Sequence, residues 1–384
     1  MNADVLDRVR RQLVDAGTPP RRSALAALVR QDTGGLAGHQ QVLGLVREAE
    51  SELAGAGPLQ HLLDQAGVTD VLVNGPDSVW VDHGAGLVPA DVHFTDEAAV
   101  RGLAQRLAAL AGRRLDDASP YVDAALPDGT RLHAVLPPVA AGGTCLSLRT
   151  FTVRAFTIDD LEHAGTLRNG AALLLRAIVR SRAAFLVSGG TGSGKTTLLA
   201  SMLGLIQQAE RLILVEDAAE LRPTHPHVVR LTARPPNVEG AGEVSLRDLV
   251  RQALRMRPDR LIVGEVRGAE VVELLTALNT GHAGSGGTLH ANSAAQVPAR
   301  LEALGALGAL DRHAVRSQVA AALQVAVHLD RLRDGRRVLT EIGVFQRERD
   351  EMVVVPAWRH DTGPVFGWDA LTDILGRHLV GSAR

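Results

Sequence analysis

The residues with the clearest chemistry are the eight from Gly189 to Thr196, Gly-Gly-Thr-Gly-Ser-Gly-Lys-Thr. They match the phosphate-binding pattern Gly-x-x-x-x-Gly-Lys-Thr, between an apolar segment and a segment with helical character. Glycines let backbone N–H groups turn toward phosphate oxygens, and the helix N-terminus adds partial positive charge. In this pattern Lys195 reaches the β- and γ-phosphates and the Thr196 hydroxyl ligates Mg²⁺. We therefore predict a site for ATP and Mg²⁺ formed by Gly189, Gly190, Thr191, Gly192, Ser193, Gly194, Lys195, Thr196 and Thr197.

Lys195 is also the one lysine of the chain, in which lysine and arginine together number 41. Elsewhere arginine supplies the positive charge. A compact ammonium group differs from a planar guanidinium in the contacts it can make. That the one lysine of the chain occupies this position supports the prediction of a phosphate site.

Carboxylates follow two further apolar segments. Glu265 comes directly after Leu261–Gly264, and an acidic cluster spans Glu216–Glu220. A carboxylate at the end of a strand can hold Mg²⁺ through a water molecule or polarise the attacking water. We predict these roles for Glu265. We expect Glu216 and Glu220 to lie beside the nucleotide, where a cation must offset their charge, and a solvated loop is the alternative.

Two histidines, His282 and His290, lie in a segment rich in glycine, serine and threonine. We predict that they sense a γ-phosphate. Metal ligation is an alternative, although no cysteine accompanies them. A structural role for one of the two histidines is a second alternative.

Arginines form two groups of candidates. Arg131 follows a predicted turn at Asp128-Gly129, and Arg149 ends a predicted strand. An arginine presented by a mobile domain can neutralise charge in the transition state. The second group lines a predicted helix and its exit: Arg251, Arg255, Arg257 and Arg260. We predict that these four form a surface that faces solvent or a neighbouring subunit.

The elements that must position these residues change character along the chain. Residues 1–55 are predicted to be a polar helical segment, 56–150 a mixed α+β domain and 151–168 a linker with a short helix. In residues 169–384, short apolar runs alternate with helical segments. This pattern is typical of an α/β fold with a parallel sheet, which binds ligands at the carboxyl ends of its strands.

Composition excludes several classes of protein. The chain has 384 residues, 46% of them hydrophobic, and a net charge of −2, so it has no global basic field for nucleic acid. Its single cysteine, Cys145, rules out an internal disulfide and a zinc site with several cysteines. No apolar run reaches membrane-span length, and the first residues lack the apolar core of a secretory signal. We therefore expect a cytoplasmic protein.

At these motifs the chain resembles the secretion-system traffic ATPases, and most closely the Tad-type, or CpaF-like, branch that powers Flp (type IVb) pilus assembly. The resemblance extends from roughly Asp64 to Thr340. The strings that carry it are Leu126–Arg131, Arg234–Gly240, Ala253–Arg260, Gly264–Gly268, Asn279–His282 and Thr288–Ser293. Type II secretion relatives often carry a four-cysteine metal module, which this chain lacks.

The resemblance implies a RecA-like P-loop ATPase domain after a PAS-like α+β domain. It implies a homo-hexamer that holds nucleotide between the two domains. Such a motor would be cytoplasmic and peripheral at the inner face of the plasma membrane, where it would drive inner-membrane platform proteins.

The resemblance also implies roles for individual residues. Glu220 matches the catalytic glutamate of the family's Asp box, and Glu265 matches the Walker B glutamate. The other matches are His282 and His290 to the His box, and Arg131 and Arg149 to arginines that approach the γ-phosphate. Gly286-Gly287 stands where relatives often carry larger residues, so we expect a looser loop between the histidines.

Three alternatives remain. One is a type IV secretion or DNA-transfer ATPase of the same superfamily. A second is a nucleotide-binding scaffold that no longer hydrolyses ATP, although such a protein is expected to lack Lys195 or Glu265. A third is a nucleic-acid-binding protein, but an aromatic content of 3% argues against stacking on bases, so no stable nucleic acid partner is expected.

Overall fold

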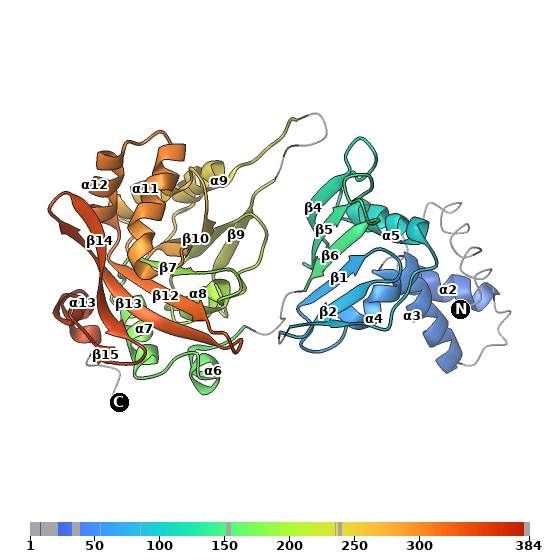
Figure 1. The fold of residues 1–384 in the computed structure, drawn as a ribbon, viewed down its shortest axis with the longest axis horizontal. Coiled ribbons are helices and arrows are strands. Elements are labelled where there is room, and N and C mark those ends of the chain that lie inside the picture. The colour runs from blue at the N-terminus through green and yellow to red at the C-terminus, as the bar shows by residue number, and fades with distance from the viewer. Residues whose placement is uncertain are drawn as a thin grey trace. The chain divides into compact units, whose positions relative to one another are not determined.

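The computed structural model describes residues 8, 22–32, 39–53, 55–84, 86–150, 155–234, 236 and 240–379. The chain divides into two compact units, Met1–Thr152 and Val153–Arg384 (Figure 1). Each unit has its own sheet and its own apolar core. The domain boundaries predicted from the sequence stay predictions.

The first unit contains a six-stranded antiparallel sheet in the order β3-β2-β1-β6-β5-β4. The strands are β1 (Asp70–Asn74), β2 (Val79–Asp82), β3 (Leu87–Pro89), β4 (Tyr121–Ala125), β5 (Arg131–Val135) and β6 (Cys145–Arg149), and the helices are η1 (Gly57–Leu59), α4 (Gln60–Leu63) and α5 (Glu97–Leu110). Every second residue of β1 and β6, such as Val71 and Leu148, joins one apolar core with Leu103 and Leu107 of α5. This alternation makes the unit an α+β domain covered on one face.

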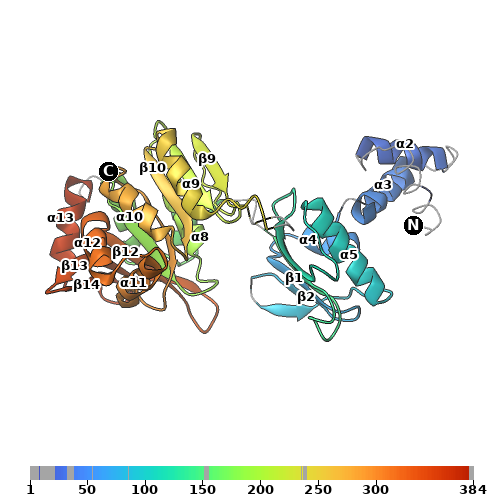
Figure 2. The ribbon, with the colours of Figure 1, turned by 90° about the horizontal axis from the view of Figure 1, so that it is seen from above.

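Two helices precede this domain, α2 (Arg22–Asp32) and α3 (His39–Leu53). They pack against each other through a small separate cluster (Figure 2). Its buried members are Leu25, Val29, Val42, Val46 and Ala49. The rest of the predicted helical segment 1–55 falls largely outside the described residues.

The second unit contains a nine-stranded sheet in the order β15-β14-β13-β12-β7-β11-β10-β8-β9. The strands are β7 (Phe185–Gly189), β8 (Leu212–Glu216), β9 (Val228–Thr232), β10 (Arg260–Val266), β11 (Gly286–His290), β12 (Val325–Arg331), β13 (Arg337–Glu348), β14 (Glu351–Arg359) and β15 (Gly363–Pro364). From β9 to β12 neighbouring strands pair in parallel, whereas β13, β14 and β15 are antiparallel additions. The carboxyl ends of β7, β8, β10 and β11 therefore lie at one edge.

Helices cover both faces of this sheet. The elements are α6 (Ile158–His163), α7 (Ala171–Arg180), α8 (Lys195–Leu203), α9 (Leu246–Ala253), η2 (Leu254–Met256), α10 (Val271–Asn279), η3 (Ala294–Gln296), α11 (Val297–Leu307), α12 (Arg312–Ala322), α13 (Trp368–Leu375) and η4 (Gly376–His378). Helices α7, α8 and α13 share one apolar cluster, and α9 to α12 share the other. Successive residues of β7 alternate between the clusters, with Phe185 in one and Leu186 in the other.

This three-layer arrangement confirms the predicted fold class. Strands buried on both faces require nearly continuous apolar runs, which is why the sequence pattern showed short runs without alternation. Among the residues that the structure describes, no helix has the length and apolar character needed to cross a membrane.

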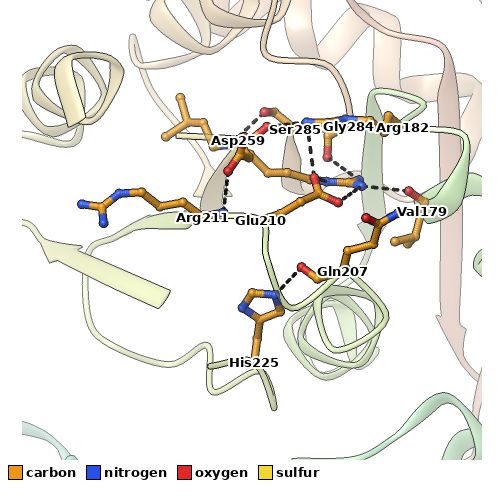
Figure 3. Close-up of polar contacts among 11 residues, drawn as sticks. Val179, Arg182, Gln207, Glu210, Arg211, His225, Asp259, Gly284 and Ser285 are labelled. Atoms are coloured by element: carbon orange, nitrogen blue, oxygen red, sulfur yellow. Dashed lines mark hydrogen bonds and ion pairs between the residues drawn. The ribbon is translucent and has the colours of Figure 1, made fainter. Parts of the chain in front are cut away.

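The opposite edge of the sheet, where the parallel strands begin, is held by a buried ion pair (Figure 3). The Arg260 side chain, at the start of β10, donates from Nε and Nη2 to the two carboxylate oxygens of Glu210 at 2.9 and 3.1 Å. Nη2 also donates to the carbonyl oxygen of Val179 at 3.1 Å, and Nη1 donates to that of Gly284 at 3.4 Å. One guanidinium therefore joins the end of α7 and the segments that lead into β8, β10 and β11.

The prediction that Arg260 belongs to a surface that faces solvent or a neighbouring subunit is therefore wrong, because Arg260 is 2% exposed. The other three, Arg251, Arg255 and Arg257, are exposed as predicted. The helix ends before Arg260, which enters the first position of a central strand. A buried arginine needs a carboxylate and additional acceptors to offset its desolvation, and Glu210 with the two carbonyls supplies them.

We expect Arg260→Met to lower the free energy of unfolding of the second unit by about 3 kcal/mol, because it leaves the Glu210 carboxylate buried with a weaker partner. Urea unfolding followed by tryptophan fluorescence measures the change. The double variant Arg260→Met with Glu210→Leu should recover most of the loss, and Arg255→Met, at an exposed position, should change stability by less than about 0.5 kcal/mol. A loss below about 1 kcal/mol in the single variant would show that this pair does not anchor the strands.

Candidate functional site

The predicted phosphate loop connects the carboxyl end of β7 to the N-terminus of α8. The Lys195 Nζ atom donates hydrogen bonds to the carbonyl oxygens of Gly189 at 3.0 Å and Gly190 at 2.9 Å. Gly192 and Gly194 have φ values of 70° and 96°, a region that favours glycine. The loop therefore curls back over its own lysine.

Lys195 is almost fully buried, and burial lowers the pKa of its ammonium group, while the nearby Glu265 carboxylate acts in the opposite direction. A partly desolvated ammonium interacts more strongly with an added anion than an exposed one does. Thr196 and Thr197 lie in the first turn of α8, where backbone N–H groups have no partners within the helix. Lysine and amides together make an anion site suited to a polyphosphate.

The residues also fit the Mg²⁺ that accompanies ATP. Among the described residues no three His, Cys, Asp or Glu side chains are grouped so that they could hold a metal ion by themselves. Mg²⁺ is commonly bound by one or two protein groups together with substrate phosphates, and Thr196 and Glu265 are groups of the required kind. The site thus fits a cation that arrives with the nucleotide.

Glu265 lies near the end of β10, at an irregularity in the pairing of β10 with β11 between Val263 and Val266. Its Oε2 atom lies 3.6 Å from Nη2 of Arg267, which contacts Asp217 Oδ2 at 2.6 Å. Because β10 pairs with β8, both predicted acidic positions come to the same edge of the sheet. The structure thus brings Glu265 close to Asp217 of the acidic cluster and to Lys195 of the loop.

Glu216 differs from the other acids because it is 4% exposed. Its Oε1 atom accepts the backbone N–H groups of Glu220 at 3.0 Å and Leu221 at 2.8 Å. A Cβ atom on Gly264 would stand 2.8 Å from Glu216 Cγ, so the side chain packs directly on β10. Burial raises the pKa of Glu216 to about 7, although the hydrogen bonds from Leu221 and Glu220 lower it.

The predicted catalytic role of Glu216 stays a prediction. Its Oε1 atom accepts hydrogen bonds from the turn that carries Glu220, whereas its buried Oε2 atom has no hydrogen-bond partner among the described residues. Glu220 is partly exposed, and this turn fixes its backbone position. The hydrogen bonds to Glu216 thus connect its carboxylate to the backbone of this turn.

The two predicted histidines lie at opposite ends of β11. His290 is paired in register with Gly189, the first residue of the phosphate loop, and is exposed. His282 lies before the strand, where its Nδ1 atom is 3.1 Å from the Ala277 carbonyl oxygen near the end of α10. The length of β11, roughly 13 Å, separates their ends of the strand. Within one chain, the alternative of a structural role fits His282, and His290 is the one beside the loop.

The expectation of a loose loop at Gly286-Gly287 is wrong. Both glycines belong to β11 and are buried between β7 and β10. A Cβ atom would stand 2.2 Å from the Phe185 carbonyl oxygen at Gly286 and 2.4 Å from the Val263 carbonyl oxygen at Gly287. The pair permits close packing of the central strands that carry His290 and the phosphate loop.

Arg131 and Arg149 are directly paired across β5 and β6 of the first unit. Arg131 Nη2 lies 3.2 Å from Asp123 Oδ2, and Arg149 is exposed. The phosphate loop belongs to the second unit. The predicted approach of these arginines to a γ-phosphate stays a prediction.

Sequence reasoning missed two residues that touch the phosphate loop, Arg331 at the end of β12 and Arg337 at the start of β13. The Arg337 Nε–H donates to the Gly192 carbonyl oxygen at 3.0 Å. The available signal was the Asp334-Gly335 turn, which is typical of a hairpin, with arginines on both sides. Nothing in the spacing related that hairpin to a loop about 140 residues upstream.

Comparison with known proteins gives a consistent result. Residues 52–334 match the family model described as Type II/IV secretion system protein. A putative conjugal transfer protein of Mycobacterium tuberculosis is 57% identical over 344 residues, which cover 88% of this chain and 98% of that protein. The conjugal transfer protein TrbB of Rhizobium radiobacter is 31% identical, over 77% of this chain and 88% of its own length.

Solved structures agree on the fold. The crystal structure of the pilus retraction motor PilT with bound ADP has a TM-score of 0.53 and 24% identity, and the match covers 76% of this chain and 80% of that one. At this identity the likeness bears on the architecture alone.

The buried carboxyl group of Glu216 predicts a dependence of stability on pH. A carboxyl whose pKa is higher in the folded state binds more protons there, so stability falls as pH rises from about 4.5 to about 7. We expect Glu216→Gln to gain stability relative to wild type by up to about 3 kcal/mol between pH 5 and pH 8, because the amide keeps the two acceptor bonds without acquiring charge.

Urea midpoints measured at several pH values test this expectation. Glu243→Gln changes an exposed carboxylate and is the matched control, which should follow the wild-type curve. A constant difference between wild type and Glu216→Gln across the range would contradict it.

Proposed function

The chain belongs to the type II/IV secretion system protein family, and we propose that it is the ATP-hydrolysing motor of a type IV secretion or DNA-transfer machine. The observation that carries the ATPase part is the buried Lys195, enclosed by its own loop, with Glu265 close enough to act on its pKa. The machine is proposed from the relatives, whose names refer to conjugal transfer and whose length the chain nearly spans.

Different residues of the site have different roles in ATP hydrolysis. The amides of the phosphate loop and the first turn of α8 bind the phosphate chain, and Lys195 neutralises its charge. Thr196 and Glu265 would hold Mg²⁺, Glu265 through water, and the cation when bound would stabilise charge on the phosphoryl oxygens. Glu220, on the turn fixed by Glu216, polarises the attacking water, with Glu265 as the other candidate for this role.

Several roles rest on the family resemblance. His290, beside Gly189, contacts the γ-phosphate or reports its presence. Arg131 and Arg149 neutralise charge in the transition state. The active form is a homo-hexamer at the inner face of the plasma membrane, where it drives platform proteins of the machine.

A second candidate is the assembly of a Tad-type pilus, which is supported by the sequence motifs. The strings Leu126–Arg131 and Ala253–Arg260 match that branch, and the single cysteine excludes the four-cysteine module of another branch. The two candidates share the ATPase and differ in what the machine moves. A deletion strain that loses surface pili but still transfers DNA would favour pilus assembly, and the reverse result would favour DNA transfer.

We expect purified protein to hydrolyse MgATP, and Lys195→Ala to lose nucleotide binding because the loop loses its cation. Glu265→Gln should bind ATP but hydrolyse it about 10² to 10⁴ times more slowly, since it cannot orient Mg²⁺-bound water or accept a proton. Phosphate release in single-turnover reactions, with enzyme in excess, measures both effects without requiring stimulation by a platform. Glu243→Gln, an exposed carboxylate, should match wild type.

Equal single-turnover rates for wild type and Glu265→Gln would move the catalytic role to Glu220. Binding of ATP without hydrolysis by the wild-type protein would instead support the nucleotide-binding scaffold.

A further inference from the structure

The hairpin formed by β12 and β13 contacts the phosphate loop at Gly189, Gly192 and Gly194. At the base, the Leu329 carbonyl oxygen lies 2.4 Å from the position of a Cβ atom on Gly189, with which Leu329 is paired. At the tip, Arg331 and Arg337 reach Gly192 and Gly194. The hairpin therefore lines one side of the loop from its first glycine to its last.

Arg337 fixes the orientation of one peptide unit of this loop. Its Nε–H donates to the carbonyl oxygen of Gly192 at 3.0 Å, and the N–H of the same peptide unit, on Ser193, donates to the Gly190 carbonyl oxygen at 3.4 Å. The C=O and N–H groups of a planar peptide unit point in opposite directions. The bond from Arg337 thus turns the carbonyl out of the loop and the N–H into it, as binding to phosphate oxygens requires.

Arg331 brings a second guanidinium to the same place. Its Nη1 atom lies 3.5 Å from the position of a Cβ atom on Gly192. Arg331 is exposed, and among the residues described here its guanidinium makes no hydrogen bond or ion pair. A cation held against a phosphate loop adds to the field that attracts anions.

The surrounding charges leave these arginines available for an anion. The hairpin tip contains four arginines and two aspartates, Asp330 and Asp334. Asp334 pairs with Arg336 at 2.7 Å, and Asp330 accepts a hydrogen bond from Thr340 at 2.8 Å. Neither aspartate contacts Arg331 or Arg337 in the part of the chain that the structure describes.

A series of polar side chains, buried at Ser188 and His328, connects the hairpin to β7, the strand before the loop. Ser188, the residue before the loop, has its Oγ atom 2.8 Å from Nδ1 of His328 in β12. His328 Nε2 lies 3.4 Å from Asp330 Oδ1, and Thr340 of β13 donates to the other carboxylate oxygen. His328 is 3% exposed, and this connection adds to the backbone pairing of β12 with β7.

We propose that Arg331 and Arg337 are part of the nucleotide site, Arg337 as the positioning residue of the phosphate loop and Arg331 as a direct ligand of the nucleotide's phosphate chain. The proposal rests on the proposed function, because it assumes that a nucleoside polyphosphate occupies the loop. The proposal means that the hairpin contributes to nucleotide affinity in addition to Lys195 and the backbone amides of the loop.

The test is equilibrium binding of the fluorescent nucleotide mant-ADP to the full chain. Arg331→Gln and Arg337→Gln should each weaken binding about tenfold, the loss expected for one charge-assisted contact. The lysine variants separate the two roles. Arg331→Lys keeps the charge and should bind within about threefold of wild type, whereas Arg337→Lys cannot reproduce the planar Nε–H donor and should stay close to the glutamine variant.

Arg333→Gln removes a charge from the same exposed hairpin and is the matched control, with binding expected within about twofold of wild type. Thermal unfolding midpoints confirm that the variants fold.

Wild-type affinity in both glutamine variants, alongside lost binding in Lys195→Ala, would overturn this inference and leave the proposed function intact. Absence of mant-ADP binding by wild type would contradict the proposed function itself. Equal losses in all three arginine positions would show a general effect of charge and would also overturn the assigned roles.

Discussion

The parallel pairing of β7 with β11 on one side and β12 on the other is the constraint on which the site depends. The backbone N–H and C=O groups of β7 are paired with these neighbours, and its side chains are buried on both faces of the sheet. The strand ends at Gly189 in fixed register with His290 and Leu329. The phosphate loop therefore starts from a rigid point, and its contacts with Arg337 and with its own lysine complete a geometry that the sheet has already set.

Buried polar groups hold both edges of this sheet, but in different ways. At the edge where the parallel strands begin, Arg260 and Glu210 neutralise each other, and the two carbonyl bonds make the pair a junction between segments. At the edge that carries the site, burial disfavours the charge of Glu216, and the nearby Arg230 offsets only part of that effect. Burial of this carboxyl group costs free energy, but its Oε1 atom supplies the acceptor that the backbone N–H groups of Glu220 and Leu221 need.

The sequence best predicted the positions of features that are formed by residues adjacent in the chain. The phosphate loop, the helix after it and the acids at the ends of β8 and β10 each follow from neighbouring residues, and so does the α/β class. Arg260 was grouped with the exposed arginines because it lies just after the predicted helix, and local pattern does not reveal which arginine enters a buried strand. The two histidines of one short segment were grouped together, although a strand between them carries them to opposite ends. The glycines of β11 were taken for a loop because the reason for their size lies in Phe185 and Val263 of neighbouring strands. Arg331 and Arg337 could not be associated with the loop, since only the order of strands in the sheet brings that hairpin to it.

The enclosure of Lys195 by the carbonyls of its own loop has a practical consequence for labelling. Because no other residue of the chain carries an ε-amino group, amine-selective acylation of a lysine side chain can modify one atom only, Lys195 Nζ. That atom is nearly buried, and its lowered pKa raises the fraction of nucleophilic free amine. The acylated peptide that contains Lys195 therefore reports on the opening of this loop, without any engineered probe and without background from other side chains, since an α-amino group is acylated on a different peptide.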